Sequence, residues 1–165
     1  MPVLTEEQTM LRDSAREWAK DHAPVGALRK MRDSGNELGF DAKTFATIAE
    51  MGWTGVVIPE AFGGSEFGYR SIGLVLEELG RSLVAAPLIG SAVGAASAIT
   101  LGGTDAQKKA WLPKIAEGKA IAALAVDEGT RHELLLPRST SFGFVPFGKD
   151  TRETRRRVRR DRRTT

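Results

Sequence analysis

The chain has 165 residues, enough for one domain with a sizeable core, and 41% of them are hydrophobic, as in soluble globular proteins. It has no cysteine, which excludes a disulfide framework, and its first residues lack the basic and apolar regions of a secretory signal. The net charge of +3 averages two unlike parts: residues 1–128 carry 13 Lys and Arg against 17 Asp and Glu, and residues 129–165 carry 11 against 4. We therefore expect a cytoplasmic protein in which only the C-terminal part is basic enough to suggest a polyanion partner.

Five amphipathic helices are predicted before residue 119, and the first two have clear start signals. The first, at about residues 5–21, begins with Thr5 and Gln8 in the spacing of a capping box, in which each side chain bonds the other residue's backbone. The second, at about residues 41–51, begins at Asp41, a residue type that caps helices well. Apolar residues recur every three or four positions in both segments, so each helix has one face to bury.

An ordered loop is predicted at residues 53–64, and a third helix follows at about residues 69–82. The loop contains β-favouring side chains, but Pro59 cannot donate to a strand ladder. Because aromatic side chains supply much of the buried area in a small core, three of them are expected to be largely buried. These are Trp53, Phe62 and Trp111.

The fourth helix, at about residues 87–102, begins at Pro87, which suits a first helical turn. Residues 83–101 approach the length of a membrane span, but their serine and threonine content favours a buried helix. A fifth helix starts at Thr104, and Pro113 is expected to kink it or end it early. The short apolar run at 120–126 then favours a buried strand.

The regular pattern is lost after about residue 130. From residue 134 on, Pro and Gly are too frequent for a long element, and residues 151–165 include eight Arg, a like-charge block typical of disorder. The sequence thus predicts a mainly α body at 4–118, a strand region at 119–133 and an irregular, disordered basic tail at 134–165. Two explanations of the tail stay open: residues after about Glu133 are out of frame or follow a rearrangement, or the tail serves an anionic partner.

Four stretches, in order, resemble the N-terminal helical domain of the acyl-CoA dehydrogenases. They are the opening pattern at 5–18, VIPEAFGG at 57–64, LEELGR at 76–81 and GTDAQKKAWLPKIAEG at 103–118. The resemblance covers residues 4 to about 128. It implies a fold with an N-terminal α-helical domain, a middle β-barrel and a C-terminal four-helix bundle, of which this chain holds the first domain and the start of a barrel strand.

The resemblance also implies a chemistry. Members of the family remove the α-proton of an acyl-CoA thioester with a Glu and pass the β-hydride to FAD, and an electron-transferring flavoprotein takes up the electrons. The base lies in the C-terminal bundle, so no catalytic residue is assigned here, and Glu60, Glu77 and Glu78 are interpreted as solvated or capping acids. We expect no turnover by the chain alone, and a homo- or hetero-oligomer in the full-length form.

The cofactor-binding residues implied by the resemblance lie at the end of the predicted strand. The backbone of Leu124, Ala125 and Val126 is expected to contact FAD, with weak or no binding of FAD by the chain alone. The family places a hydroxyl residue and a Glu where this chain has Ala125 and Val126, so the hydroxyl contact is lost. This departure is typical of a divergent subfamily, including non-catalytic subunits that pair with an active partner.

The substrate-binding residues implied by the resemblance lie in the fourth helix. Leu88, Ile89 and Val93 are expected to line the acyl pocket, and core packing is the alternative for all three. No metal site is expected, because His22 and His132 lie far apart in the chain without an acidic cluster.

Two other classes of function stay open. The chain could be a non-catalytic helical partner subunit, or the Arg-rich tail could bind nucleic acid or an anionic surface. The Arg-rich stretch at 151–165 has no aromatic residues on which bases could stack, so nucleic-acid binding is the weaker of the two.

Overall fold

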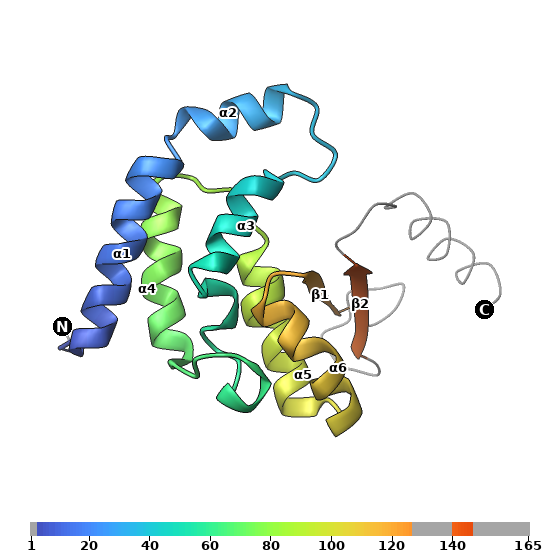
Figure 1. Ribbon diagram of the computed structural model, residues 1–165. Coiled ribbons are helices and arrows are strands. Elements are labelled where there is room, and N and C mark those ends of the chain that lie inside the picture. Colours follow the sequence, from blue (N-terminus) through green and yellow to red (C-terminus); the bar gives the residue numbers. More distant parts are fainter. Residues whose placement is uncertain (1–2, 127–139, 147–165) are drawn as a thin grey trace, which may run out of the picture.

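A computed structural model describes residues 3–126 and 140–146 of the chain (Figure 1). Within these ranges the fold is mainly helical, as the sequence predicts. The α-helices are α1 (Glu6–His22), α2 (Gly26–Asp33), α3 (Ala42–Glu50), α4 (Gly68–Arg81), α5 (Ala96–Gly102) and α6 (Asp105–Ala116). The shorter elements are the 3-10 turns η1 (Trp53–Gly55) and η2 (Glu60–Phe62), the π-helical segment η3 (Ile89–Ala95), and the strands β1 (Ala120–Val126) and β2 (Thr140–Pro146).

The predicted helix starts are confirmed by their caps. The Thr5 hydroxyl accepts the Gln8 amide at 3.2 Å, while the Gln8 side chain accepts the Thr5 amide, which closes a capping box at the start of α1. Thr104 and Gln107 form the same box at the start of α6. These bonds satisfy amides that the first helical turn leaves without intrahelical partners.

Two apolar clusters hold the helices together. In the first, α1 and α4 lie side by side and bury Ala15, Trp18 and Val75 between them (Figure 1). The second joins α5 and α6 to the loop before α4, and its centre includes Ile58 and Leu112. In the part of the chain that the structure describes, no helix is long and apolar enough to cross a membrane.

Two local expectations about helices are wrong. The sequence interpretation missed α2, which is short and begins without a side-chain cap. This helix buries none of its residues and lies across the ends of α1 and α3 (Figure 1). The interpretation also expected Pro113 to kink the last helix or end it early, and the early end is wrong, because α6 continues past Pro113 to Ala116. Leu112 and Ile115 are fully buried on either side of Pro113, so core packing offsets the missing amide.

The tail prediction is wrong for residues 140–146. This stretch forms β2, which pairs antiparallel with β1, Ala120 opposite Pro146 and Val126 opposite Thr140. Its sequence, TSFGFVP, contains several β-favouring residues, and its one Pro stands at the last position, where it interrupts no ladder. The predictions for 127–139 and 147–165, including disorder and the Arg-rich segment, lie outside the described residues.

Of the three aromatic residues expected to be buried, one is confirmed. Trp53 is 1% exposed and meets Trp18 edge-on, with 5.4 Å between ring centroids. Phe62 and Trp111 are only partly buried and pack against the second cluster from outside. Trp111 lies near the surface of α6, where the Lys114 ammonium stands 5.0 Å from its ring centroid. The burial prediction is thus confirmed for Trp53, while Phe62 and Trp111 are buried in part.

Candidate functional site

The two sets of predicted site residues lie on neighbouring elements. Strand β1, which carries the cofactor set, packs against η3, which carries Ile89 and Val93 of the substrate set. One hydrogen bond joins the two elements: the Ala122 amide donates to the Ser91 hydroxyl at 3.1 Å. Both residues are buried, so the bond is shielded from water. The face between η3 and β1 is the candidate functional site.

The Ser91 bond shows which way the backbone of β1 points. Because the Ala122 amide donates to Ser91, it does not donate to β2, and amides alternate in direction along a strand. The pairing agrees, since Ala120 lies opposite Pro146, which has no amide hydrogen to give. The amide and carbonyl of Leu124 therefore point away from β2. In the described part of the chain, that edge of β1 has no further strand beside it.

Among the residues that the structure describes, the end of β1 combines a backbone edge without a neighbouring strand, called the free edge below, with an accessible side chain. Leu124 is 38% exposed, whereas Ala120 and Ala122 on the same strand are 2% and 8% exposed. The strand thus leaves the core between Ala122 and Leu124. A planar ligand with hydrogen-bonding groups along its rim could meet the Leu124 amide and carbonyl there.

The segment η3 has the geometry of a π-helix and is rich in small residues. Gly90 and Gly94 have low helix propensity, so the sequence favours a regular α-helix only weakly here. The Ala96 amide donates to the Ser91 carbonyl five residues earlier as well as to Val93, which is the wide turn of a π-helix. Such turns are frequent at functional sites, and this one lies directly against β1.

The three predicted substrate residues differ in how far they are buried. Leu88 is 2% exposed and belongs to the first apolar cluster, and Val93 packs against the same cluster. Ile89 is 68% exposed. Leu88 and Val93 thus pack in or against the core, which was the alternative to lining the acyl pocket. Ile89 faces outward. The interpretation missed Ser91, which no spacing singled out among the Ser and Thr residues of this stretch.

A buried carboxylate lies elsewhere, between α1 and α4. Glu78 is 3% exposed and accepts two hydrogen bonds from the Arg16 guanidinium, at 2.8 and 3.1 Å. These bonds hold the pKa of the Glu78 carboxyl below its usual range, although burial opposes the shift. Arg81 adds a weaker contact at 3.5 Å. Glu78 is therefore held as an anion between helices, which suits a structural role and not that of a general base.

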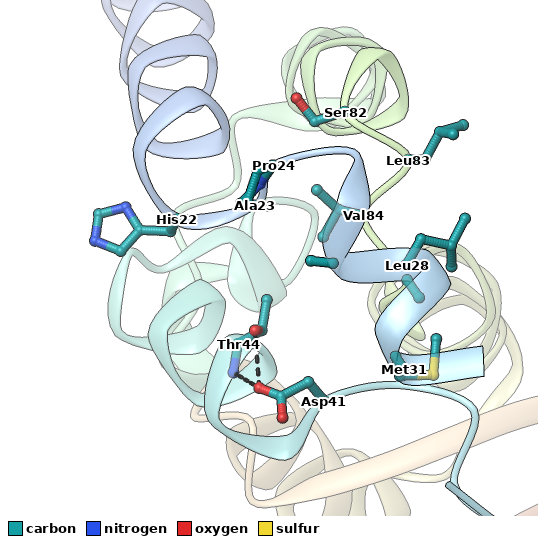
Figure 2. A pocket seen from close by; sticks show the side chains of 12 residues that line it. His22, Ala23, Pro24, Leu28, Met31, Asp41, Thr44, Ser82, Leu83 and Val84 are labelled. Atoms are coloured by element: carbon teal, nitrogen blue, oxygen red, sulfur yellow. Dashed lines mark hydrogen bonds between the residues drawn. The ribbon is translucent and has the colours of Figure 1, made fainter. Parts of the chain in front are cut away.

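A small hollow opens at the other end of the helical body, beside α2. Figure 2 shows Asp41 on one side of it, its carboxylate accepting the amide and hydroxyl of Thr44, and Leu28, Met31 and Val84 on the other side. Its volume is about 40 Å³, far below the several hundred Å³ of ordinary ligand pockets. None of its lining residues belongs to η3 or β1. Among the described residues, no group of three or more His, Asp and Glu could hold a metal ion.

The motifs quoted for the family resemblance have structural roles here. A Cβ at Gly64 would fall on the carbonyl group of Ile58, so the last residue of the loop motif must be Gly. A Cβ at Gly118 would collide with Ala49, and Gly118 also has a φ of +68°. Glu78 of the helix motif pairs with Arg16 and so joins α4 to α1, whereas Arg81 pairs with Glu77 and Glu78 within α4. The motif residues Gly64, Gly118, Glu78 and Arg81 thus stabilise the fold through close packing and ion pairs.

The fold and the motifs together define the helical domain of a flavoenzyme class. The family model described as "Acyl-CoA dehydrogenase, N-terminal domain" matches residues 5–119. The chain belongs to the acyl-CoA dehydrogenase family, and it corresponds to the N-terminal part of that family's members.

Known relatives agree with this assignment. The chain is 40% identical over 127 residues to a (2S)-methylsuccinyl-CoA dehydrogenase of Cereibacter sphaeroides, a match that covers 76% of this chain and 22% of that protein. Among solved structures, the ChsE4–ChsE5 complex of Mycobacterium tuberculosis matches at a TM-score of 0.71 and 25% identity, covering 81% of this chain and 36% of that one. An acyl-CoA dehydrogenase of Bacillus anthracis complexed with FAD shares the fold at a TM-score of 0.65 and 22% identity, covering 78% and 22%.

Proposed function

We propose that this chain forms the helical wall and first barrel strand of an FAD-dependent acyl-CoA dehydrogenase that acts on the CH–CH bond of an acyl-CoA thioester. The observation that carries the proposal is the free edge of β1 beside η3, in a chain of this family. Bound FAD would accept the hydride in such an enzyme. The relatives named above, one of them complexed with FAD, support the choice of cofactor.

The donor set of β1 fits a flavin. The polar rim of a flavin ring offers both acceptors and a donor, and the free edge of Leu124 offers one amide and one carbonyl. We propose that the backbone of Leu124, Ala125 and Val126 binds the ring there. Ala125 has no hydroxyl to add, so the backbone alone would carry the contact.

We also propose a position for the acyl-CoA. Ile89 is the exposed member of the substrate set and lies on the segment that packs against β1, so it could contact the acyl chain. Leu88 and Val93 would pack against the core beneath Ile89 and hold this segment in place. An electron-transferring flavoprotein as electron acceptor, and assembly into an oligomer, belong to the same proposal. The complex of two different chains among the solved relatives supports the assembly.

The chain on its own is proposed to be inactive. It spans between about a fifth and two fifths of the length of the relatives it matches. Its most conspicuous described acids are unsuited to act as the base, because Glu77 and Glu78 are both engaged by Arg81, and Glu78 also by Arg16. A non-catalytic partner subunit is the second candidate, and Ala125 and Val126 favour it, since they replace the hydroxyl residue and the Glu of active members.

A pair of substitutions at Leu124 tests the flavin contact. Leu124→Pro removes the amide hydrogen on the free edge of β1 without removing a β1–β2 bond, because that amide faces away from β2. Leu124→Ala shortens the side chain and keeps the amide. In a calorimetric titration with FAD, we expect weak binding by the wild type and the Ala variant, and binding about tenfold weaker in the Pro variant. Equal affinity in the two variants contradicts the contact.

An assay with acyl-CoA and an artificial electron acceptor tests the proposed inactivity. We expect no turnover above a blank that contains free FAD. Turnover that copurifies with the chain would contradict this part of the proposal. A chain that binds acyl-CoA but not FAD would identify the partner-subunit alternative.

A further inference from the structure

We propose that Ser91 is a positioning residue that fixes the register of β1 against the helical wall, and thereby places the Leu124 backbone where it meets the cofactor. The direct observation is the buried bond from the Ala122 amide to the Ser91 hydroxyl, between residues 31 apart in sequence. Because the flavin contact is itself part of the proposed function, the role of Ser91 toward FAD rests on that proposal.

Strand β1 needs such an anchor because its sequence specifies register poorly. The strand reads AIAALAV, and Ala120 and Ala122, which are both buried in the second apolar cluster, are identical. A slip of two residues toward the chain end keeps the same face inward: Ala120 takes the place of Ala122, and Gly118 takes the place of Ala120. The two buried sites then differ from the aligned state by a single methyl group. Alanine is also a weak strand former, so side-chain packing adds little preference. A polar group that accepts one particular amide removes this ambiguity.

The burial of Ser91 makes the bond selective. Its side chain is 2% exposed, so no bulk water replaces the Ala122 amide if the strand moves. A buried donor and acceptor that lose each other leave two unsatisfied groups, which is more costly than the loss of a surface bond. The aligned state of β1 is therefore favoured over a slipped one.

The π-helical turn brings the hydroxyl to this position. The Ser91 carbonyl accepts the Ala96 amide in the wide turn, and the Ser91 amide donates to Pro87 at 3.0 Å. The backbone of Ser91 is thus held on both sides, which fixes its Cβ direction. Leu124 follows Ala122 by two residues, so its backbone faces the same edge of β1. Fixing the Ala122 amide therefore also fixes the position of the Leu124 backbone.

The experiment uses two pairs of variants of the whole chain. Ser91→Ala is compared with the wild type, and Ser91→Val with Ser91→Thr, since Val and Thr have nearly the same shape and differ in the hydroxyl. Ser97→Ala serves as a surface control, because the Ser97 hydroxyl accepts from Tyr69 at 2.8 Å away from β1. Hydrogen exchange of the Ala122 and Leu124 amides is followed by NMR, and the affinity for FAD is measured by titration.

We expect the Ala122 amide to exchange about tenfold faster whenever the hydroxyl is lost, in both pairs, with no change in Ser97→Ala. The Kd for FAD should rise in the same two variants, Ala and Val. Unchanged exchange in both pairs overturns the anchoring role. Faster exchange with an unchanged Kd for FAD overturns the positioning role toward the cofactor. A wild-type chain that binds no FAD contradicts the proposed function instead, and the exchange data then still decide whether Ser91 anchors β1.

Discussion

The guanidinium of Arg16 on α1 donates two hydrogen bonds to the carboxylate of Glu78 on α4, at 2.8 and 3.1 Å, although Glu78 is almost fully buried. The Arg16 side chain remains 55% exposed, so the pair spans from the core to the surface. The pair joins two helices, and its two residues lie 62 positions apart in sequence. The buried position of the carboxylate makes it sensitive to the loss of its partner.

Replacing Glu78 by Ala should destabilise the fold by about 2 kcal/mol, because Arg16 and Arg81 lose a shared anion and the helices lose a contact. This is below the figure usual for a fully buried pair, since Arg16 is half exposed. Glu77→Ala is the matched control: its carboxylate is 60% exposed and pairs with Arg81 at the surface of α4. We expect a change within about 0.5 kcal/mol for it, by urea unfolding. Similar losses in the two variants would contradict the role given to Glu78.

The same pair predicts a pH dependence. Hydrogen bonds from Arg16 lower the pKa of Glu78 in the folded chain below its usual value of 4.5. The unfolded chain therefore binds a proton at a higher pH than the folded chain does, and the stability gained from ionised Glu78 is present above pH 4.5 and lost as the pH falls through the lower, folded pKa. The difference in unfolding free energy between wild type and Glu78→Gln should be constant from pH 7 to 5 and shrink below 4.5. A difference that grows toward acid pH would contradict this sign.

Two glycines of different surroundings test the account of the loop motif. Gly64→Ala places a methyl group on the carbonyl of Ile58, and we expect a loss of more than about 2 kcal/mol. Gly73→Ala, in the exposed face of α4 with no atom within 4 Å of the new Cβ, should instead raise stability by about 0.5–1 kcal/mol. Thermal unfolding of both variants gives the comparison. A Gly64→Ala chain that melts with the wild type would refute the close approach.

Trp53 and Trp111 differ in burial, so their replacement should differ in its effect on stability. Trp53 is 1% exposed at the centre of the first cluster, and its replacement by Ala should cost about 3–5 kcal/mol. Trp111 is only partly buried, so we expect Trp111→Ala to cost less, about 1–2 kcal/mol. Urea unfolding monitored by circular dichroism measures both. An equal or larger loss for Trp111 would contradict the burial order.

The sequence predicts those parts of the fold that are encoded locally. Capping boxes at Thr5 and Thr104 are complete within four residues, so the starts of α1 and α6 could be predicted closely. Helix α2 was missed because it is only eight residues long, begins without a side-chain cap and follows Pro24, which is typical of the end of a helix. The pairing of β1 with β2 depends on residues from separate stretches of the chain, which periodicity within one segment does not reveal.

The candidate site was only partly predictable, for the same reason. The sequence pointed to β1 and to the helix that precedes it, yet it gave no sign that Ser91 and Ala122 would meet. It also treated Leu88, Ile89 and Val93 alike, whereas burial divides them. Which side of a helix faces the core follows from packing between helices, and a wide π-turn shifts that side in a way that regular helical spacing does not describe.

Titration of the isotopically labelled chain with FAD, followed by amide NMR, tests the central claim most directly. If the free edge of β1 and the adjoining η3 segment form the cofactor face, the largest chemical-shift changes will fall on residues 121–126 and 89–95. The residues beside the small hollow of Figure 2, such as Thr44 and Leu28, will be unchanged. No shifts at millimolar FAD, or shifts centred on that hollow, would contradict the account.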